Sequence, residues 1–301
     1  MSDIAPPATP SPAAAPRPIA FDFLTLGVRF LRSHREVSLM LVLLLLMALV
    51  GILAPLIAPD PAAINPANRL KPPSAEHWLG TDHLGRDVFA RLIFGTRTSM
   101  IVGFSVAAAT TLIGVVIGLY AGFSRIGGAI VMRLNDAMMS IPAVLLAIAL
   151  ASLMSQGLTA VIVAITIPEI PRMVRVVRAL VLGVRKQPYI AAAVSIGTRG
   201  VPLVTRHVIP NTTGLVLVQA TYACASAIIA SAVLAFLGVG TSPDVPSWGG
   251  MMADARRQFR LHPDMMLYPG LALSALVLIV NILGDRLSDA MDPRKSRRGI
   301  L

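Results

Sequence analysis

The sequence has little of what soluble domains and catalytic sites depend on. Charged residues make up 14% of the chain and aromatic residues 5%, and there is a single cysteine, Cys224. One cysteine cannot form an intrachain disulfide, and because Cys224 lies in an apolar run, a redox role is not expected. Nucleic acid is not expected as a partner either, because stacking surfaces need several aromatic residues interleaved with basic ones and the aromatic content is too low to supply them.

What the chain has instead is long uncharged runs. Hydrophobic residues make up 55% of its 301 residues, which is typical of an integral membrane protein. The first run, 37–58, would form a helix about 33 Å long, which is enough to span a bilayer. Residues 1–36 are rich in Ala and Pro and then basic, so we expect a cytoplasmic N-terminal tail that is largely disordered.

The remaining runs predict five further transmembrane helices. A Pro-rich polar segment, 59–97, is expected outside the cell, and the second span follows at 98–124. The region 137–182 is long for one helix and short for two, but a tight hairpin of two spans keeps all Arg-rich segments on one side. Spans five and six are expected at 212–238 and 266–283. The predicted fold is all-α, with about six transmembrane helices and both termini in the cytoplasm.

This topology accounts for the formal net charge of +11. Most Lys and Arg residues fall in segments assigned to the cytoplasm, including the basic tail 288–301, whereas acidic residues nearly balance the external ones. The hairpin draws Asp136 and Glu169 toward the membrane boundary. Each has an arginine three residues away, Arg133 and Arg172, and residues at this spacing are neighbours on a helix.

Small residues recur at every fourth position in two of the spans, which places each set on one helix face. They either allow close helix packing, within the protein or with a partner, or reflect the abundance of Ala and Gly in membrane helices, and both interpretations remain open. Pro142 is expected to bend the third span. The two sets are Gly114, Gly118 and Gly122, and Ala223, Ala227, Ser231 and Ala235.

A short amphipathic helix is predicted between the fourth and fifth spans, in the stretch RKQPYIAAAVSIG. Pro188 suits its first turn and Gly197 suits its end. Apolar residues at positions i, i+3, i+4 and i+7 form one face, which the protein's own spans or lipid headgroups could cover. These residues are Tyr189, Ala192, Ala193 and Ile196.

Residues 189–211 resemble the cytoplasmic coupling loop of the permease subunits of bacterial ABC importers. The pattern of that family is E-A-A, three residues, G, and I-x-L-P further along. The matching positions are Ala191, Ala192, Ala193, Gly197, Val208, Ile209 and Pro210, with Ala191 in place of the usual Glu. In that family the short helix docks in a groove on a cytoplasmic ATPase. The resemblance therefore implies coupling to an ATPase through Pro188, Tyr189, Ala191, Ala192, Ala193, Ile196, Gly197, Arg199, His207, Pro210 and Asn211.

Five further stretches, in order along the chain, resemble the C-type permease of the dipeptide, oligopeptide and nickel importers. On this resemblance, residues 98–287 form the permease core, with five transmembrane helices and a coupling loop at 185–211. One departure is Arg286, which replaces the usual Gly. The stretches are LGTDHLGRDVFARLIFGTRTSM (79–100), MRLNDAMMSIPAVLLAI (132–148), RMVRVVRALVL (172–182), IIASAVLAFLGVG (228–240) followed by PSWGGMM (246–252), and NILGDRLSDAMDPR (281–294).

The resemblance implies one of two permease subunits in an ATP-driven importer of the prokaryotic inner membrane, for dipeptides, oligopeptides or a similar small solute. The implied partners are a homologous permease, two ATP-binding subunits, membrane lipid, and an external substrate-binding protein that touches 77–97 and 240–264. The chain has no GxxxxGK[ST] loop and no nucleophile paired with a base, so we expect it to bind no ATP and catalyse no reaction. ATP and Mg are then expected on the partner ATPases.

A crowded group of His and Asp residues allows a competing hypothesis, an external metal site. His77, Asp82, His83 and Asp87 are ligand types that suit a transition metal. Several of them belong to the family-like segment, however, where turn-forming Gly and a paired Asp and Arg serve the structure of the loop, so no metal is expected. The residues assigned to this external segment are Gly80, Thr81, Asp82, Gly85, Arg86 and Asp87.

Polar residues within the spans have two interpretations as well. They either face a translocation path or form hydrogen bonds between helices. An ion-coupled secondary transporter or a membrane scaffold protein is the alternative function, and the residues do not identify the solute among dipeptides, oligopeptides, metal chelates and glutathione-like molecules. The candidates for the path are Gln219, Tyr222, Ser226, Ser231 and Asn281.

Overall fold

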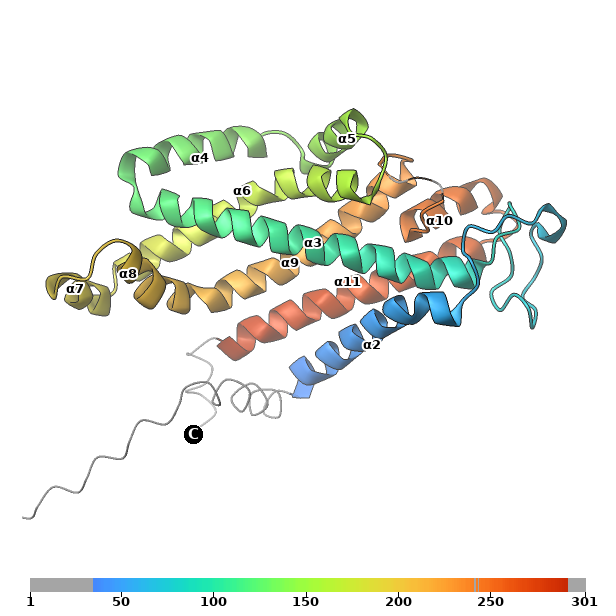
Figure 1. Ribbon diagram of the computed structural model, residues 1–301, viewed down its shortest axis with the longest axis horizontal. Helices are drawn as coiled ribbons and strands as arrows, with labels where there is room; N and C mark the ends of the chain where they lie inside the picture. The colour runs from blue at the N-terminus through green and yellow to red at the C-terminus, as the bar shows by residue number, and fades with distance from the viewer. Residues whose placement is uncertain (1–34, 241, 243, 292–301) are drawn as a thin grey trace, which may run out of the picture.

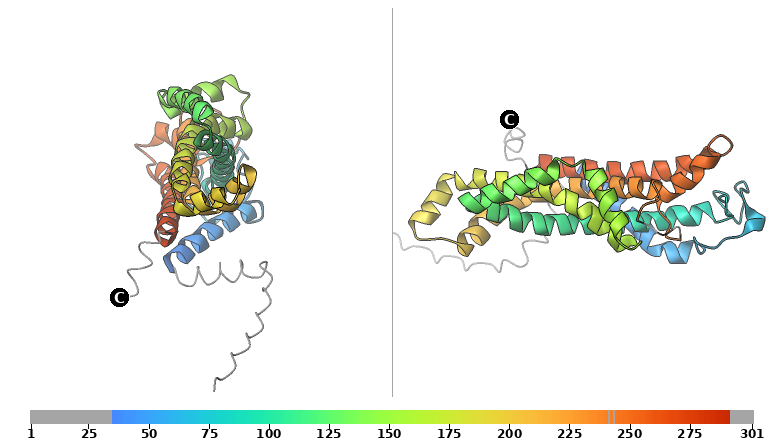
Figure 2. Two further views of the ribbon diagram at one scale, coloured as in Figure 1. Left: turned by 90° about the vertical axis from the view of Figure 1, so that its left-hand side faces the viewer. Right: turned by 90° about the horizontal axis from the view of Figure 1, so that it is seen from above.

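The computed structural model describes residues 35–240, 242 and 244–291, so the expected N-terminal tail and most of the basic C-terminal tail lie outside the described residues. The described chain is an elongated bundle of helices that run roughly in one direction (Figure 1). The short helices after residue 187 lie at one end of the bundle and the 59–87 segment at the other, as the view from above also shows (Figure 2). The predicted all-α fold is confirmed.

Within the described residues, four helical segments are long and apolar enough to cross a membrane, and a bent helix pair gives at most a fifth. The sequence predicts about six such spans. The difference is α6 (Leu158–Arg185), which packs against α3 but carries Glu169 and four arginines and is therefore not apolar enough to count. The other long helices are α2 (Arg35–Ile57), α3 (Val88–Phe123), α9 (Ile209–Phe236) and α11 (Asp264–Met291), and the bent pair is α4 (Arg125–Met139) and α5 (Ala143–Leu153).

The bend predicted at Pro142 is confirmed. Helices α4 and α5 meet at 85°, and Pro142 is the residue that precedes α5. Proline lacks the backbone N–H and disfavours helical geometry in the residue before it, so α4 ends and a new helix begins. The preceding reversal, from α3 into α4, is just as tight, because Ser124 ends α3 and its hydroxyl accepts a hydrogen bond from the N–H of Gly127 at 3.0 Å.

Helix α3 begins ten residues earlier than the boundary expected at residue 98. Asp87 caps its first turn by accepting a hydrogen bond from the N–H of Ala90 at 2.7 Å. The hydropathy pattern placed the boundary later because Arg91 and Arg97 interrupt the apolar run. Arg91 is buried among protein groups rather than exposed to lipid, so the helix accommodates it. The external segment before α3 is therefore 59–87, with a single turn of 3₁₀-helix at Pro66–Asn68.

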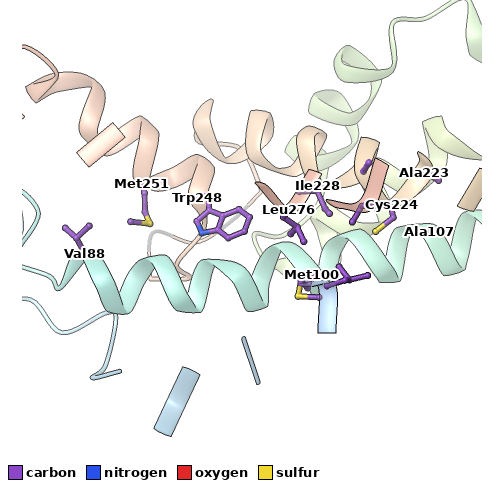
Figure 3. Packing of buried hydrophobic residues seen from close by; sticks show 12 residues of the cluster. Val88, Met100, Ala107, Ala223, Cys224, Ile228, Trp248, Met251 and Leu276 are labelled. Carbon is purple, nitrogen blue, oxygen red and sulfur yellow. The ribbon is translucent and has the colours of Figure 1, made fainter. Parts of the chain in front are cut away.

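The core beneath this external end is built around Trp248, the first residue of α10 (Trp248–Ala255). Its indole is fully buried and its Nε1–H donates a hydrogen bond to the carbonyl of Leu92 at 2.9 Å. Figure 3 shows the indole lying over α3, with Met251 to one side and Leu276 and Ile228 to the other. Gly95 leaves room for it, because a Cβ there would lie 2.7 Å from the ring. This contact fixes the loop between α9 and α11 onto the start of α3.

The small-residue stripe of the second span packs within the protein. A Cβ on Gly118 would lie 2.6 Å from the Cβ of Val177, and one on Gly122 would lie 2.8 Å from the Cβ of Val181. Gly114 faces Met173 in the same way, so the three glycines form a seam along which α3 and α6 approach closely. For these glycines, the interpretation as helix-packing residues is confirmed.

Candidate functional site

The predicted coupling helix is present as α7 (Pro188–Ser195). Proline stands in its first turn, as expected, and Gly197 follows its end with φ of +94°. The N–H of Gly197 donates to the carbonyl of Val194, and the N–H of Thr198 donates to the carbonyl of Ala193, both at 3.0 Å. This pair of bonds is the Schellman motif, which requires a left-handed residue where Gly197 stands.

The apolar face predicted for this helix is divided in the structure. Ile190 and Ala193 are buried against Val177 and Val181 of α6 and against the following turn. By contrast, Tyr189, Ala192 and Ile196 are exposed, and 84% of the Ile196 side chain is accessible. The protein's own helices therefore cover the predicted face at Ala193, and they leave it uncovered at Tyr189, Ala192 and Ile196.

The rest of the coupling loop forms an exposed surface beside α7. Ala191, Arg199 and Pro210 are exposed, whereas His207 is half-buried. A helical turn at Val201–Leu203 and a π-helical turn at Val204–Val208 lead into α9, and Asn211 donates a hydrogen bond to the carbonyl of His207 at 2.7 Å. The structure thus brings all of the predicted coupling residues to one end of the bundle (Figure 1). Their role in coupling remains a prediction.

The external segment is organised by the carboxylate of Asp82. Its Oδ1 accepts hydrogen bonds from the N–H groups of Leu84 at 2.8 Å and Arg86 at 2.9 Å. Its Oδ2 pairs with the guanidinium of Arg86 at 2.6 Å and with that of Arg91 at 3.0 Å. Gly85 is required for the turn, because it has φ of +77° and a Cβ there would overlap the carbonyl of Asn65. Gly80 has φ of +76°, and the buried Thr81 donates to the carbonyl of Asn68, so the predicted residues act as loop structure.

A second partner of this cluster was not apparent in the sequence. Arg86 also pairs with Asp254 of α10 at 2.7 Å, although 168 positions separate the two residues. The predicted metal candidates are divided: His77 pairs with Asp87 at 2.8 Å, whereas ligand atoms of Asp82, His83 and Asp254 lie within 4.8 Å of one another. Two guanidinium groups already neutralise these carboxylates, so the group fits a structural ion cluster better than a cation site.

The residues proposed for a translocation path are partly engaged in hydrogen bonds. Tyr222 of α9 donates to Asp285 of α11 at 2.5 Å, and Ser226 donates to Glu169 of α6 at 2.8 Å. Ser231 donates to a carbonyl of its own helix at 2.8 Å, and Gln219 and Asn281 are half-buried. The Tyr222 and Ser226 bonds connect neighbouring helices, and lining of a path by the five residues remains a prediction.

One of the two predicted ion pairs forms as expected and the other does not. Glu169 pairs with Arg172 at 3.4 Å, three residues on along α6. Asp136, expected to pair with Arg133, instead pairs with Arg175 at 2.7 Å. The reason is tertiary: α4 packs against α6, which Asn135 also supports by donating to the carbonyl of Pro171 at 3.0 Å.

Comparison with known proteins identifies the class that this fold and loop define. Residues 114–297 match the family model of the binding-protein-dependent transport system inner membrane component. The chain is 47% identical, over 90% of its length and 93% of the relative's, to a probable peptide ABC transporter permease protein of Sinorhizobium fredii. It is 36% identical, over 88% of both chains, to a dipeptide transport system permease protein of Alkalihalophilus pseudofirmus.

A solved structure agrees at the level of the fold. A chain of the inward-facing MetNI methionine ABC transporter superimposes with a TM-score of 0.56 at 20% identity, covering 68% of this chain and 98% of its own length. The chain thus belongs to the family of binding-protein-dependent transport system inner membrane components and is a multi-pass membrane protein.

Proposed function

We propose that the chain is one of two permease subunits of an ATP-driven importer for dipeptides, oligopeptides or a similar small solute. The observation that carries this proposal is the two-sided coupling helix. Ile190 and Ala193 fasten α7 to α6, and the neighbouring Tyr189 and Ile196 are left uncovered at the end of the bundle. An exposed apolar face on an anchored helix suits a docking partner. A scaffold or an ion-coupled transporter does not require a docking helix of this kind.

The proposal assigns sides to the bundle. The end with α7, and with it both chain termini, faces the cytoplasm, and the 59–87 segment and the loop before α11 face the external substrate-binding protein. The chain itself binds no ATP and catalyses no reaction, and ATP with Mg is bound by two partner ATPases. ATP binding closes the ATPases, displaces α7 and opens the path outward, and hydrolysis restores the inward-facing state. Nucleotide energy thereby biases two states of the paired permeases.

Cysteine accessibility tests both the orientation and the docking. In a Cys224→Ala background, Ile196→Cys is expected to react with a membrane-impermeant maleimide in inside-out vesicles and to be protected when the ATPase subunits are present. Asp60→Cys, at the opposite end of the bundle, is the matched control and should react only from outside. Labelling of Ile196→Cys from the outside, or labelling that ATPase subunits leave unchanged, would contradict the proposal.

Substrate class is tested with the complete transporter. The detergent-purified complex should contain a second permease and nucleotide-binding subunits, and a substrate-binding protein loaded with peptide should raise its ATPase activity. Absence of ATPase subunits, under conditions that preserve other complexes, would favour a scaffold. ATPase activity that responds to a different solute and to no peptide would support the importer function but contradict peptide as its substrate.

A further inference from the structure

Helix α6 carries charge at a depth where a membrane protein normally has none. Met173 packs on Gly114, and the apolar run of α3 extends from Thr98 to Phe123. At 1.5 Å per residue, Gly114 lies about 5 Å from the middle of that run. Arg172, next to Met173, therefore lies within the roughly 30 Å hydrocarbon layer.

The guanidinium of Arg172 is not enclosed by this chain. Its side chain is 53% exposed, and the described residues pair it with Glu169 at 3.4 Å. An arginine at this depth costs about 2.5–3.5 kcal/mol or more when it faces lipid, so such residues face a water-filled cavity or another subunit. The exposed side of α6 therefore faces the interior of the assembled transporter, which hydropathy alone does not reveal.

Glu169 fixes the position of this arginine. Its side chain is 7% exposed, its Oε1 accepts a hydrogen bond from Ser226 of α9 at 2.8 Å, and its Oε2 faces Arg172. Because the Glu169–Arg172 contact is long and a guanidinium has five donors, most of the donors of Arg172 are free for another acceptor. Glu169 acts as a positioning residue that orients Arg172 while leaving its outer edge available.

The surroundings favour an anion as that acceptor. On the facing helix α4, Asp136 is already neutralised by Arg175 at 2.7 Å, and Arg133 adds a further exposed positive charge. Arginines thus outnumber carboxylates in this part of α4 and α6. A guanidinium matches a carboxylate in a planar, two-pronged arrangement.

We propose that Arg172 binds the C-terminal carboxylate of the transported peptide as it passes between the two permeases. The proposal rests on the function proposed above, and it explains how one site serves peptides of differing side chains, since every unmodified peptide carries this group. The half-exposed guanidinium keeps the interaction partly hydrated, which allows the peptide to leave again.

Uptake of matched peptides by the complete transporter tests this assignment. The probe is one dipeptide as the free acid and as the C-terminal amide, and the readout is the ratio of the two uptake rates. Arg172→Gln is expected to lower this ratio by about 10-fold or more, because it removes a charged hydrogen bond. Since each variant is compared with wild type, the selectivity of the binding protein cancels. Arg175→Gln, one turn away, also removes one positive charge, but its guanidinium is engaged by Asp136. It is the matched control for charge alone and should lower the ratio much less than Arg172→Gln.

Two further variants separate binding from folding. Glu169→Gln is expected to raise KM for the free acid and leave uptake of the amide unchanged. In a Cys224→Ala background, Arg172→Cys should regain uptake of the free acid after reaction with a thiol reagent that adds an ammonium group. A neutral reagent of similar size should not restore it.

The possible outcomes distinguish failure of the Arg172 proposal from failure of the proposed peptide substrate. Equal loss of acid and amide uptake in Arg172→Gln, or equal rescue by charged and neutral reagents, would overturn the role of Arg172 while leaving the importer intact. Failure of Arg172→Cys to react from either side in any nucleotide state would show that the partner permease covers it, and would also overturn the proposal. An intact wild-type complex that hydrolyses ATP but imports no peptide would reject the peptide substrate instead.

Discussion

Replacing Gly118 with alanine should force α3 and α6 apart. The added Cβ would lie 2.6 Å from the Cβ of Val177, 2.8 Å from its Cγ1 and 3.1 Å from the carbonyl oxygen of Val174. Carbon atoms normally approach to about 3.5–4.0 Å, so the helices must separate locally by about 1 Å. A change of rotamer at Val177 cannot relieve the contact, because its Cβ is fixed to the backbone. Overpacking of this kind costs about 1–3 kcal/mol.

Gly183→Ala is the matched control for this change. Gly183 lies in α6, near its end, and a Cβ there would meet nothing within 4 Å. Alanine favours a helix over glycine by about 1 kcal/mol, so the control should be neutral or slightly stabilising. The difference between the two variants therefore isolates the overpacking cost and should amount to about 2–12 °C in apparent melting point.

The assay is thermal unfolding of the detergent-solubilised complex, followed by size-exclusion chromatography, together with peptide uptake. Adding Val177→Ala to Gly118→Ala should not rescue stability, because alanine keeps the clashing Cβ. Equal melting points for Gly118→Ala and Gly183→Ala would refute the glycine seam as a close-packed contact. Full rescue by Val177→Ala would show that the backbone separation is larger than described.

Three further predictions concern other parts of the molecule. Gly197→Ala should reduce uptake while the complex still assembles, because a φ of +94° costs an L-residue about 1–2 kcal/mol although its surroundings are open. Gly197→Asn should lose less uptake than Gly197→Ala. Normal uptake in Gly197→Ala at normal expression would count against the coupling role of this loop. Asp82→Asn should destabilise the folded chain by up to about 3–5 kcal/mol, because Asp254 alone then remains to neutralise two buried arginines. The exposed Asp60→Asn should melt like wild type, and a stable Asp82→Asn would contradict this ion cluster. Cys224 should resist maleimide in the folded protein and react after denaturation, and rapid reaction under native conditions would contradict its burial.

The coupling segment could be predicted closely because its signals are local. Pro188 and Gly197 mark the start and end of α7 through backbone geometry that depends on neighbouring residues alone. Pro142 marked the break between α4 and α5 for the same reason. The division of the α7 surface could not be predicted, since Ala193 turns inward only because α6 and the turn before α9 lie beside it.

The predictions that the structure corrects share one cause, which is charge pairing between residues far apart in the sequence. The sequence predicts a start of α3 that is too late because Arg91 and Arg97 interrupt the apolar run, whereas Asp82 neutralises Arg91 within the protein. Asp136 was assigned to Arg133 by its spacing, but packing of α4 on α6 offers Arg175. Helix α6 fails the apolar criterion for a span because it carries Glu169 and four arginines, which find partners in the folded chain. Arg175 pairs with Asp136 of α4, and Arg178 and Arg185 donate hydrogen bonds to carbonyl groups near the end of α3.

The close packing of α3 against α6 at the glycine seam links two steps of the proposed mechanism, which are substrate binding and ATPase docking. Val177 and Val181 fit against the glycines of α3 on one side and touch the anchor of α7 on the other, so α3, α6 and α7 have little freedom to slide past one another. Arg172 lies on the same helix, five residues before Val177 and nine before Val181. Occupancy of Arg172 and the nucleotide state of the ATPases are therefore expected to be linked, and thermodynamic reciprocity follows. If nucleotide binding changes the affinity for a carboxylate by some factor, the carboxylate must change the affinity for nucleotide by the same factor.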